Sequence, residues 1–159
     1  MSVLEAVPWE ESWTWGLSLI VLTIAIHATG VASMGLLVRV VNVRAKSMSL
    51  QLRDALAILI GLIGAAGLLL ALLHGFEAGL WAAAYWWVGA LHSWTEAIFY
   101  SVDSITTRGA AGLTLEGRWQ MMGALEAMDG VLLFGISTAF IFAAIQVFWP
   151  TIIADRDPN

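Results

Sequence analysis

The chain of 159 residues contains no cysteine, which excludes disulfide bonds, thiolate metal sites and cysteine nucleophiles. Charged residues are also scarce, at 12% of the sequence, and the formal net charge is −5. So few charges argue against a nucleic-acid partner. The three histidines are scattered, and neither a phosphate-binding glycine loop nor a Ser-His-Asp arrangement is apparent. We therefore expect neither an enzyme nor a resident metal or other cofactor.

Basic residues are missing from the beginning of the sequence. No Lys or Arg precedes Arg39, whereas Glu5, Glu10 and Glu11 lie near the N-terminus. A secretory signal peptide begins with a positively charged segment, so we expect the first apolar stretch to be retained.

Apolar residues, in contrast, make up 60% of the sequence, and the mean hydropathy is +0.83. Both values lie outside the range of ordinary soluble domains and indicate an integral membrane protein in contact with lipid. Residues 16–41 and 119–149 form apolar stretches long enough to cross a hydrocarbon core of about 30 Å as helices.

A third apolar stretch, residues 55–91, is too long for one simple crossing, because a continuous helix would exceed the bilayer by about 25 Å. Two alternatives remain open. Either the stretch breaks near His74 and Gly75, or, as the aromatic residues beyond Glu77 favour, one helix leaves the membrane and continues along its outer surface.

The basic residues indicate the orientation. Arg39, Arg44, Lys46 and Arg53 cluster around a polar loop at residues 42–53, and the positive-inside rule places such a loop in the cytoplasm. The N-terminus is then outside and the tail at residues 151–159 cytoplasmic. Three tryptophans predict a short helix at the outer interface within residues 1–15: Trp9, Trp13 and Trp15.

Residues 93–106 predict a helix too short to cross a membrane. Ser93 can cap it, with Glu96 as the capping-box partner three residues later. A stretch rich in Gly and Ala follows, and non-helical backbone at membrane depth is tolerated only where protein or a water-filled cavity surrounds it. This arrangement is typical of a re-entrant loop.

Residues 96–112 and the following apolar stretch resemble the pore helix, selectivity filter and inner helix of a potassium channel. In that pore-loop superfamily the short helix ends in Thr-Thr-Val-Gly-Tyr-Gly-Asp or a close variant. The matching segment here departs from the pattern after its two threonines and again after its first glycine: Thr106, Thr107, Arg108, Gly109, Ala110, Ala111, Gly112. The resemblance implies a homotetramer in a bacterial inner membrane, with a central pore and permeant monovalent cations.

Polar and small residues of the last apolar stretch add candidates. Glu126 and Asp129 share one helix face and could form carboxylate rings near a conduction path, although Glu126 could instead bond the pore helix or neighbouring backbone. The resemblance extends to Ser137 and Thr138, which we expect at the pore or cavity. It makes Gly130, and with it Gly135, a candidate hinge; close helix packing is the alternative for both.

Arg108 decides the expected ion chemistry. An arginine in the membrane costs roughly 3 kcal/mol, so we expect a partner, and Asp103, five residues earlier, is the natural one. We expect Asp103 and Glu96 behind the filter-like loop. If Arg108 instead faced the pore axis, its positive charge would favour anions or closure. His27, within the first apolar stretch, predicts an interhelical hydrogen bond or, alternatively, a proton sensor.

The sequence therefore predicts an all-α integral membrane protein with three main transmembrane helices plus a re-entrant pore helix and a filter-like loop. The expected divisions are residues 1–15, 16–54, 55–150 (the pore module) and 151–159. The expected function is passive, cation-preferring ion conduction by a homotetramer in membrane lipid. Two alternatives remain: a non-conducting channel-like scaffold or subunit, and a non-selective or anion pore lined by Arg108.

Overall fold

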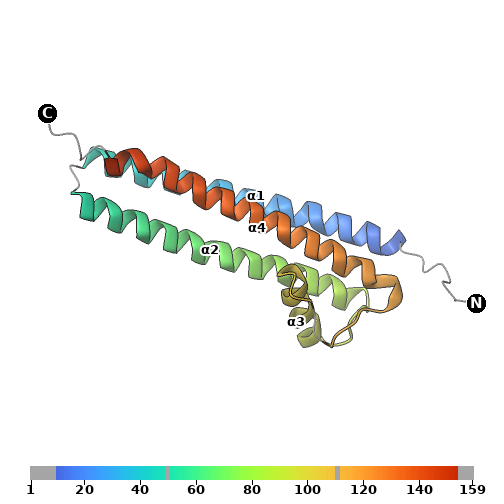
Figure 1. Cartoon of the computed structure of the whole chain (residues 1–159). Coiled ribbons are helices and arrows are strands. Elements are labelled where there is room, and N and C mark those ends of the chain that lie inside the picture. Colours follow the sequence, from blue (N-terminus) through green and yellow to red (C-terminus); the bar gives the residue numbers. More distant parts are fainter. Residues whose placement is uncertain (1–9, 49–50, 110–111, 154–159) are drawn as a thin grey trace, which may run out of the picture. The chain divides into compact units, whose positions relative to one another are not determined.

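The computed structural model describes residues 10–48, 51–109 and 112–153 (Figure 1). Within them the chain forms four α-helices and one short 3₁₀ turn, and no strand: α1 (Glu10–Ser47), α2 (Leu52–Trp87), α3 (Trp94–Ile105), η1 (Gly117–Trp119) and α4 (Gln120–Ile153). The predicted all-helical fold is confirmed.

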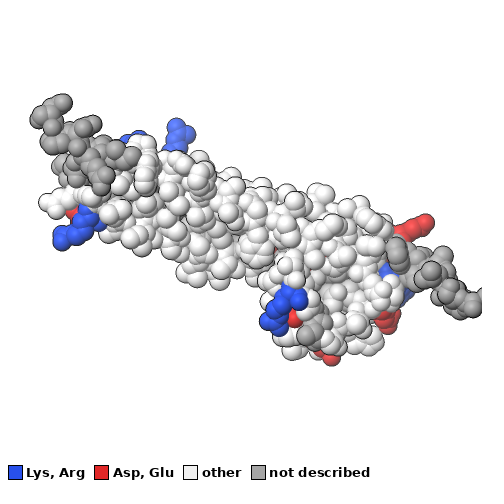
Figure 2. Space-filling model, in the orientation of Figure 1, with Lys and Arg blue, Asp and Glu red and all other residues white. Residues whose placement is uncertain are grey.

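Three of these helices are long and apolar enough to cross a membrane, namely α1, α2 and the η1–α4 segment. Many of their large apolar side chains are exposed, including Val21, Ile60 and Phe142. Figure 2 shows a surface that is mostly uncharged on the face displayed, with Lys, Arg, Asp and Glu confined to a few places. The number and the apolar character of the predicted membrane helices are thus confirmed.

Several predicted helix boundaries were wrong. Trp13 and Trp15 belong to α1 itself, which begins at Glu10, so no separate interfacial helix exists after residue 9. Trp9 lies outside the described residues. The same helix continues through the segment expected to be a loop and ends at Ser47. Residues 42–47 contain Arg, Lys and Ala, which favour helix, so polarity alone did not end it.

The break considered near Gly75 does not occur, because α2 is one unbroken helix from Leu52 to Trp87. It ends in a Schellman motif: the N–H of Ala90 donates to the carbonyl of Tyr85, and the N–H of Gly89 to that of Trp86. Gly89 occupies the left-handed position of this motif, with φ of 72°.

The predicted short helix is confirmed as α3, with Ser93 at its N-cap and Thr106 at its C-cap. The Ser93 side chain, however, makes no capping hydrogen bond, so the predicted capping box is absent. At the other end of the chain, α4 does not stop at Pro150 but includes it and ends at Ile153. A proline so near a helix end removes only one intrahelical hydrogen bond.

The chain divides into two compact units, and α1, α2 and α4 each contribute one stretch to both. Unit 1 consists of Met1–Ile26 and His74–Phe134 and therefore includes α3. Its buried apolar cluster contains several aromatic residues, among them Trp81, Tyr85 and Trp119. Carboxylates and hydroxyl groups are also buried in this unit: Ser12, Thr23, Glu77, Ser101, Asp103, Ser104, Glu126 and Asp129.

Unit 2 consists of His27–Leu73 and Gly135–Asn159. Its buried cluster is aliphatic apart from two phenylalanines: Val38, Ala45, Ala55, Leu59, Ala66, Leu70, Phe140, Ala144, Phe148 and Ile152. The buried polar residues of unit 2 are His27, Asn42 and Ser137, and none of its described carboxylates is buried.

Candidate functional site

The filter-like segment begins as the cap of α3. The N–H of Arg108 donates to the carbonyl of Asp103 at 3.0 Å, and the N–H of Thr107 donates to that of Ser104 at 2.8 Å. These two bonds form a second Schellman motif, with Thr107 in the left-handed position at φ of 57°. A β-branched residue rarely adopts this conformation, which costs about 1–2 kcal/mol. The loop therefore holds backbone strain that Gly89 avoids at the end of α2.

The carbonyl groups of residues 106–109 accept no hydrogen bond from the described residues. The carbonyls that cap α3 belong to residues 102–104, and within the described residues no hydrogen bond is made to a carbonyl oxygen of residues 106–109. Thr106, Thr107, Arg108 and Gly109 are all exposed. Unpaired backbone acceptors in a non-helical segment need water, an ion or another chain as a partner. Ala110 and Ala111 lie outside the described residues.

Arg108 pairs with Asp103, as the sequence predicted: the Nε atom of Arg108 lies 3.1 Å from Oδ1 of Asp103. The Asp103 side chain is almost fully buried, whereas that of Arg108 remains 68% exposed. The pair therefore links the buried side of α3 to the exposed loop. Asp103 Oδ2 has no hydrogen-bond partner in the described residues, so Arg108 satisfies only half of this carboxylate.

Buried hydrogen bonds connect α3 to α2 and α4. The hydroxyl of Ser101 has two acceptors within reach, the carbonyl of Ala78 on α2 at 2.7 Å and the Glu126 carboxylate on α4, and its single proton serves one of them at a time. Tyr85 on α2 donates to Glu126 Oε2 at 2.7 Å. Ser104, one turn after Ser101, donates to the carbonyl of Gly123 at 2.9 Å. The three contacts made by Ser101 and Ser104 fix both the depth and the rotation of α3, and the bond from Tyr85 holds the Glu126 side chain in place.

Asp129, one turn after Glu126, joins α1 and α2 to α4. Its Oδ2 atom accepts hydrogen bonds from Thr23 Oγ1 at 2.7 Å and from Trp81 Nε1 at 3.0 Å. Both carboxylates are fully buried within one chain. In this conformation they face its interior rather than a space between chains, so the expectation that they line a pore needs correction. For Glu126 the alternative interpretation, a bond to the short helix, agrees with its contact to Ser101.

Gly130 allows α4 to approach the end of α3. A Cβ atom added there would overlap with the carbonyl oxygen of Ile105 and lie 2.8 Å from its carbonyl carbon. Backbone cannot move aside as a side chain can, so close packing explains this glycine. Around Gly135, in contrast, an added Cβ would meet nothing within 4 Å. The helix is continuous through both residues, and a hinge at either one stays a prediction.

The remaining predicted residues are dispersed. Glu96 is exposed in the first turn of α3, nine residues before Ile105 and about 13 Å away along the helix, so it does not lie behind the loop. In unit 2, Ser137 is buried and its Oγ atom lies 3.0 Å from Nε2 of His27, which agrees with the predicted interhelical hydrogen bond. Thr138 is exposed.

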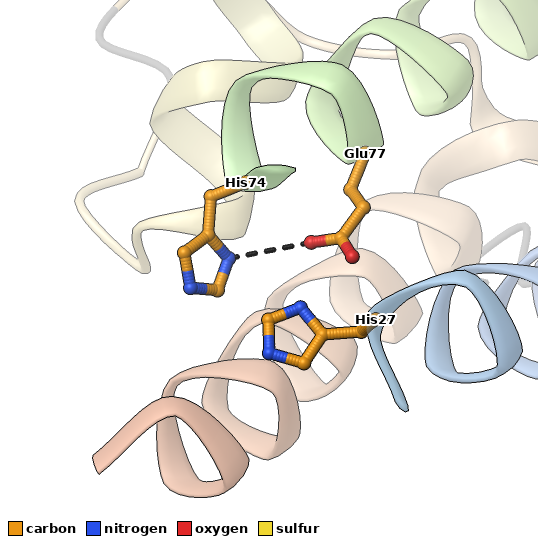
Figure 3. A group of neighbouring side chains, drawn as sticks. All are labelled: His27, His74 and Glu77. Atoms are coloured by element: carbon orange, nitrogen blue, oxygen red, sulfur yellow. Dashed lines mark ion pairs between the residues drawn. The ribbon is translucent and has the colours of Figure 1, made fainter. Parts of the chain in front are cut away.

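An interaction that the sequence analysis missed lies within α2. The Nδ1 atom of His74 lies 3.4 Å from Oε2 of Glu77, and the two side chains face each other in Figure 3. The His74 ring also stacks on Phe134, with ring centroids 4.3 Å apart. The i, i+3 spacing of two ionisable residues in an apolar stretch was the signal available for this pair.

The hydrogen-bond donors to the buried carboxylates were also missed: Thr23, Trp81, Tyr85 and Ser101. A buried carboxylate must have partners, so the sequence required donors somewhere on neighbouring helices. Which donors face which carboxylate depends on the rotation of each helix, and the pattern of apolar residues leaves that rotation open when nearly all faces are apolar.

No protein-family model, curated protein or solved structure matches this chain.

Proposed function

We propose that this chain is the subunit of a potassium-channel-like homotetramer that conducts ions passively across a membrane. In this proposal α3 is a re-entrant pore helix, residues 106–112 are an atypical filter, and α4 is the inner helix. The observation that supports it best is the exposed set of carbonyl groups at residues 106–109, directly after a short helix that is anchored by buried polar contacts.

In a membrane, the exposed carbonyls of residues 106–109 would need polar partners that lipid cannot supply. Backbone acceptors facing lipid cost several kcal/mol each, so an exposed loop at membrane depth requires a cavity or other chains around it. Four copies around an axis would satisfy this requirement, and their carbonyls could replace the hydration shell of a monovalent cation. The strained φ of Thr107 also fits a functional loop, because such strain concentrates at sites where a binding geometry is held in place.

The Arg108–Asp103 pair supports a preference for cations. A guanidinium held by a buried carboxylate is partly neutralised and tied to the side of the loop. Since Glu126 and Asp129 face the chain interior, any attraction for cations would come from the carbonyl groups and the negative C-terminal end of α3. We expect weaker selectivity than in a filter with the full potassium-channel pattern.

A non-conducting membrane subunit is the second candidate. It is favoured by the exposure of Arg108, whose side chain is 68% accessible even when paired. A positive charge beside the loop in each of four chains would oppose cation entry. In an anion pore lined by Arg108, the same positive charges would face the pore axis and attract anions.

Current recording from the purified full-length chain in planar bilayers tests the proposal. We expect a passive current in KCl whose reversal potential in a salt gradient indicates cations. The absence of any current from reconstituted tetramers would favour the non-conducting subunit. If Arg108→Leu alone changed an anion-preferring current into a cation-preferring one, the arginine would face the axis and our placement of it would be wrong.

For the orientation, we propose an outer N-terminus and a cytoplasmic C-terminus, because the basic residues gather where α1 ends and α2 begins. A cysteine introduced at Ser47 should react with an impermeant thiol reagent only after the cells are opened. Labelling of this cysteine in intact cells would indicate the opposite orientation.

A further inference from the structure

Unit 2 contains an apolar groove between α1 and α2. It is lined by Met34, Leu37 and Val38 on α1 and by Leu62, Ala65, Ala66 and Leu69 on α2, and the hollow between them measures about 20 Å³. No polar atom contributes to its surface. Leu37 and Leu69 remain 54% and 44% exposed, so the groove is open to the surface rather than closed over.

The same unit has a concentration of positive charge at the end of α1. The described residues of unit 2 include four basic side chains but only one acidic one, Asp54, which contacts Arg53 at 3.9 Å. Arg39, Arg44 and Lys46 are exposed. No ion pair joins these three residues to another in residues 10–48, 51–109 and 112–153. In Figure 2, Lys and Arg side chains are visible near the end of α1, with a smaller area of acidic side chain beside them.

One basic residue continues the line of the groove. Arg44 follows Leu37 by seven residues, so it lies on nearly the same face of α1, two turns and about 10 Å further along. Arg39 lies on a different face, because its rotation from Leu37 is about 200°. A chain lying in the groove would thus lead to Arg44 rather than to Arg39.

We propose that this groove binds one acyl chain of an anionic phospholipid, with the headgroup phosphate held by Arg44. The apolar lining supplies contacts for methylene groups, each worth about 0.8 kcal/mol when buried. The guanidinium supplies charge-assisted hydrogen bonds to phosphate oxygens. A basic site at the end of two membrane helices is the arrangement expected for binding an anionic headgroup. The inference requires only that unit 2 lies in a membrane and does not depend on ion conduction.

The charge favours an anionic lipid over a second copy of the chain. A second copy of unit 2 would bring its own excess of basic side chains, whereas an anionic headgroup would neutralise the excess already present. An acyl chain can follow so narrow a groove, and its charged end would reach the excess of positive charge.

Native mass spectrometry of the full-length chain, released from detergent with added lipid, tests the proposal. The probes are dioleoyl phosphatidylglycerol, which is anionic, and dioleoyl phosphatidylcholine, which has the same acyl chains and no net charge. We expect the wild-type chain to retain one phosphatidylglycerol in preference to phosphatidylcholine. Ala65→Leu, which fills the groove from an exposed position, should lower retention of both lipids by about tenfold. Ala32→Leu makes the same change at an exposed residue outside the groove and should leave retention unaltered.

The headgroup is tested by a second matched pair of variants. Arg44→Gln should reduce the preference for phosphatidylglycerol about fivefold, the value of one basic residue near an anionic headgroup, whereas Arg39→Gln should leave it nearly unchanged. Ala65→Val provides a milder filling variant if Ala65→Leu does not fold. Equal retention of the two lipids by the wild type, or equal losses from Arg39→Gln and Arg44→Gln, would overturn the proposal. If Ala65→Leu dissociated an oligomer without changing the lipid count, a second copy would occupy the groove instead.

Discussion

Units 1 and 2 are built from stretches of the same three long helices, yet their interiors differ in kind. In unit 1 the buried carboxylates Glu126 and Asp129 accept hydrogen bonds from hydroxyl and indole groups on three other helices. The buried cluster of unit 2 contains only aliphatic side chains and phenylalanine. Apolar packing holds helices together but tolerates small rotations and shifts, whereas a hydrogen-bonded network fixes one arrangement.

The difference coincides with the position of α3. This short helix belongs to unit 1, and each of its serines, Ser101 and Ser104, is bonded to a neighbouring helix. A helix of 12 residues buries too little apolar surface to be held firmly by packing alone. The polar network therefore serves to position the loop that follows α3.

The largest contrast is expected from two glycines of α4. Gly130→Ala in unit 1 should destabilise the chain by about 3 kcal/mol, because its Cβ meets the backbone of Ile105. Gly135→Ala in unit 2 should be neutral or stabilise by up to about 1 kcal/mol, since the space is open and alanine favours helix. Thermal unfolding in detergent, monitored by circular dichroism, measures the stability of both variants. If the two variants lost similar amounts of stability, α3 would not approach α4 more closely at Gly130 than other groups approach α4 at Gly135.

Removing a carboxylate should have the next largest effect. Glu126→Ala leaves the hydroxyl of Tyr85 without its acceptor and removes the contact with Ser101, and we expect a loss of about 1–3 kcal/mol. Phe148→Leu, a conservative change in the core of unit 2, should cost less than about 1.5 kcal/mol. In a double-mutant cycle Tyr85→Phe should cost little once Glu126 is absent. Additive losses would mean that the hydrogen bond between Tyr85 and Glu126 contributes nothing.

The strained turn of unit 1 should respond in the opposite direction. Thr107→Gly removes a β-branched residue from a left-handed conformation and should stabilise the chain by about 1 kcal/mol. Gly89→Thr, at the equivalent position of the turn after α2, should destabilise it by a similar amount. If the loop is a filter, Thr107→Gly should also reduce conductance despite the gain in stability. Unchanged current would show that the strain has no role in conduction.

The smallest expected effect concerns the ion pair, because Arg108 is largely exposed and such pairs contribute about 1 kcal/mol or less. Asp103→Asn should lower the stability of the protein, and adding Arg108→Leu should recover part of the loss, since no unpaired charge remains. The measurement is the melting temperature of all four members of the cycle. Independent, additive effects would show that Asp103 and Arg108 are not energetically coupled.

The sequence was sufficient for features that depend on neighbouring residues or on composition. Long apolar stretches of α1, α2 and α4 must be helical in lipid, because backbone groups there have no water to bond. The short helix α3 was predicted within one residue at each end, because a cap residue precedes it and a Gly-containing segment follows it. The pair of Asp103 and Arg108 was predictable from their separation along the chain and from the cost of an unpaired charge in the membrane.

Only the tertiary structure decided which way the inner polar residues face. The sequence placed Glu126 and Asp129 on one helix face, but an apolar helix such as α4 has no polar side to show which face is inward. The donors Thr23, Trp81, Tyr85 and Ser101 lie between 25 and 106 residues away in the sequence from the carboxylates they bind. In lipid, hydrophobicity does not orient helices, so close packing at residues such as Gly130 and buried hydrogen bonds determine how they rotate and how α3 is placed.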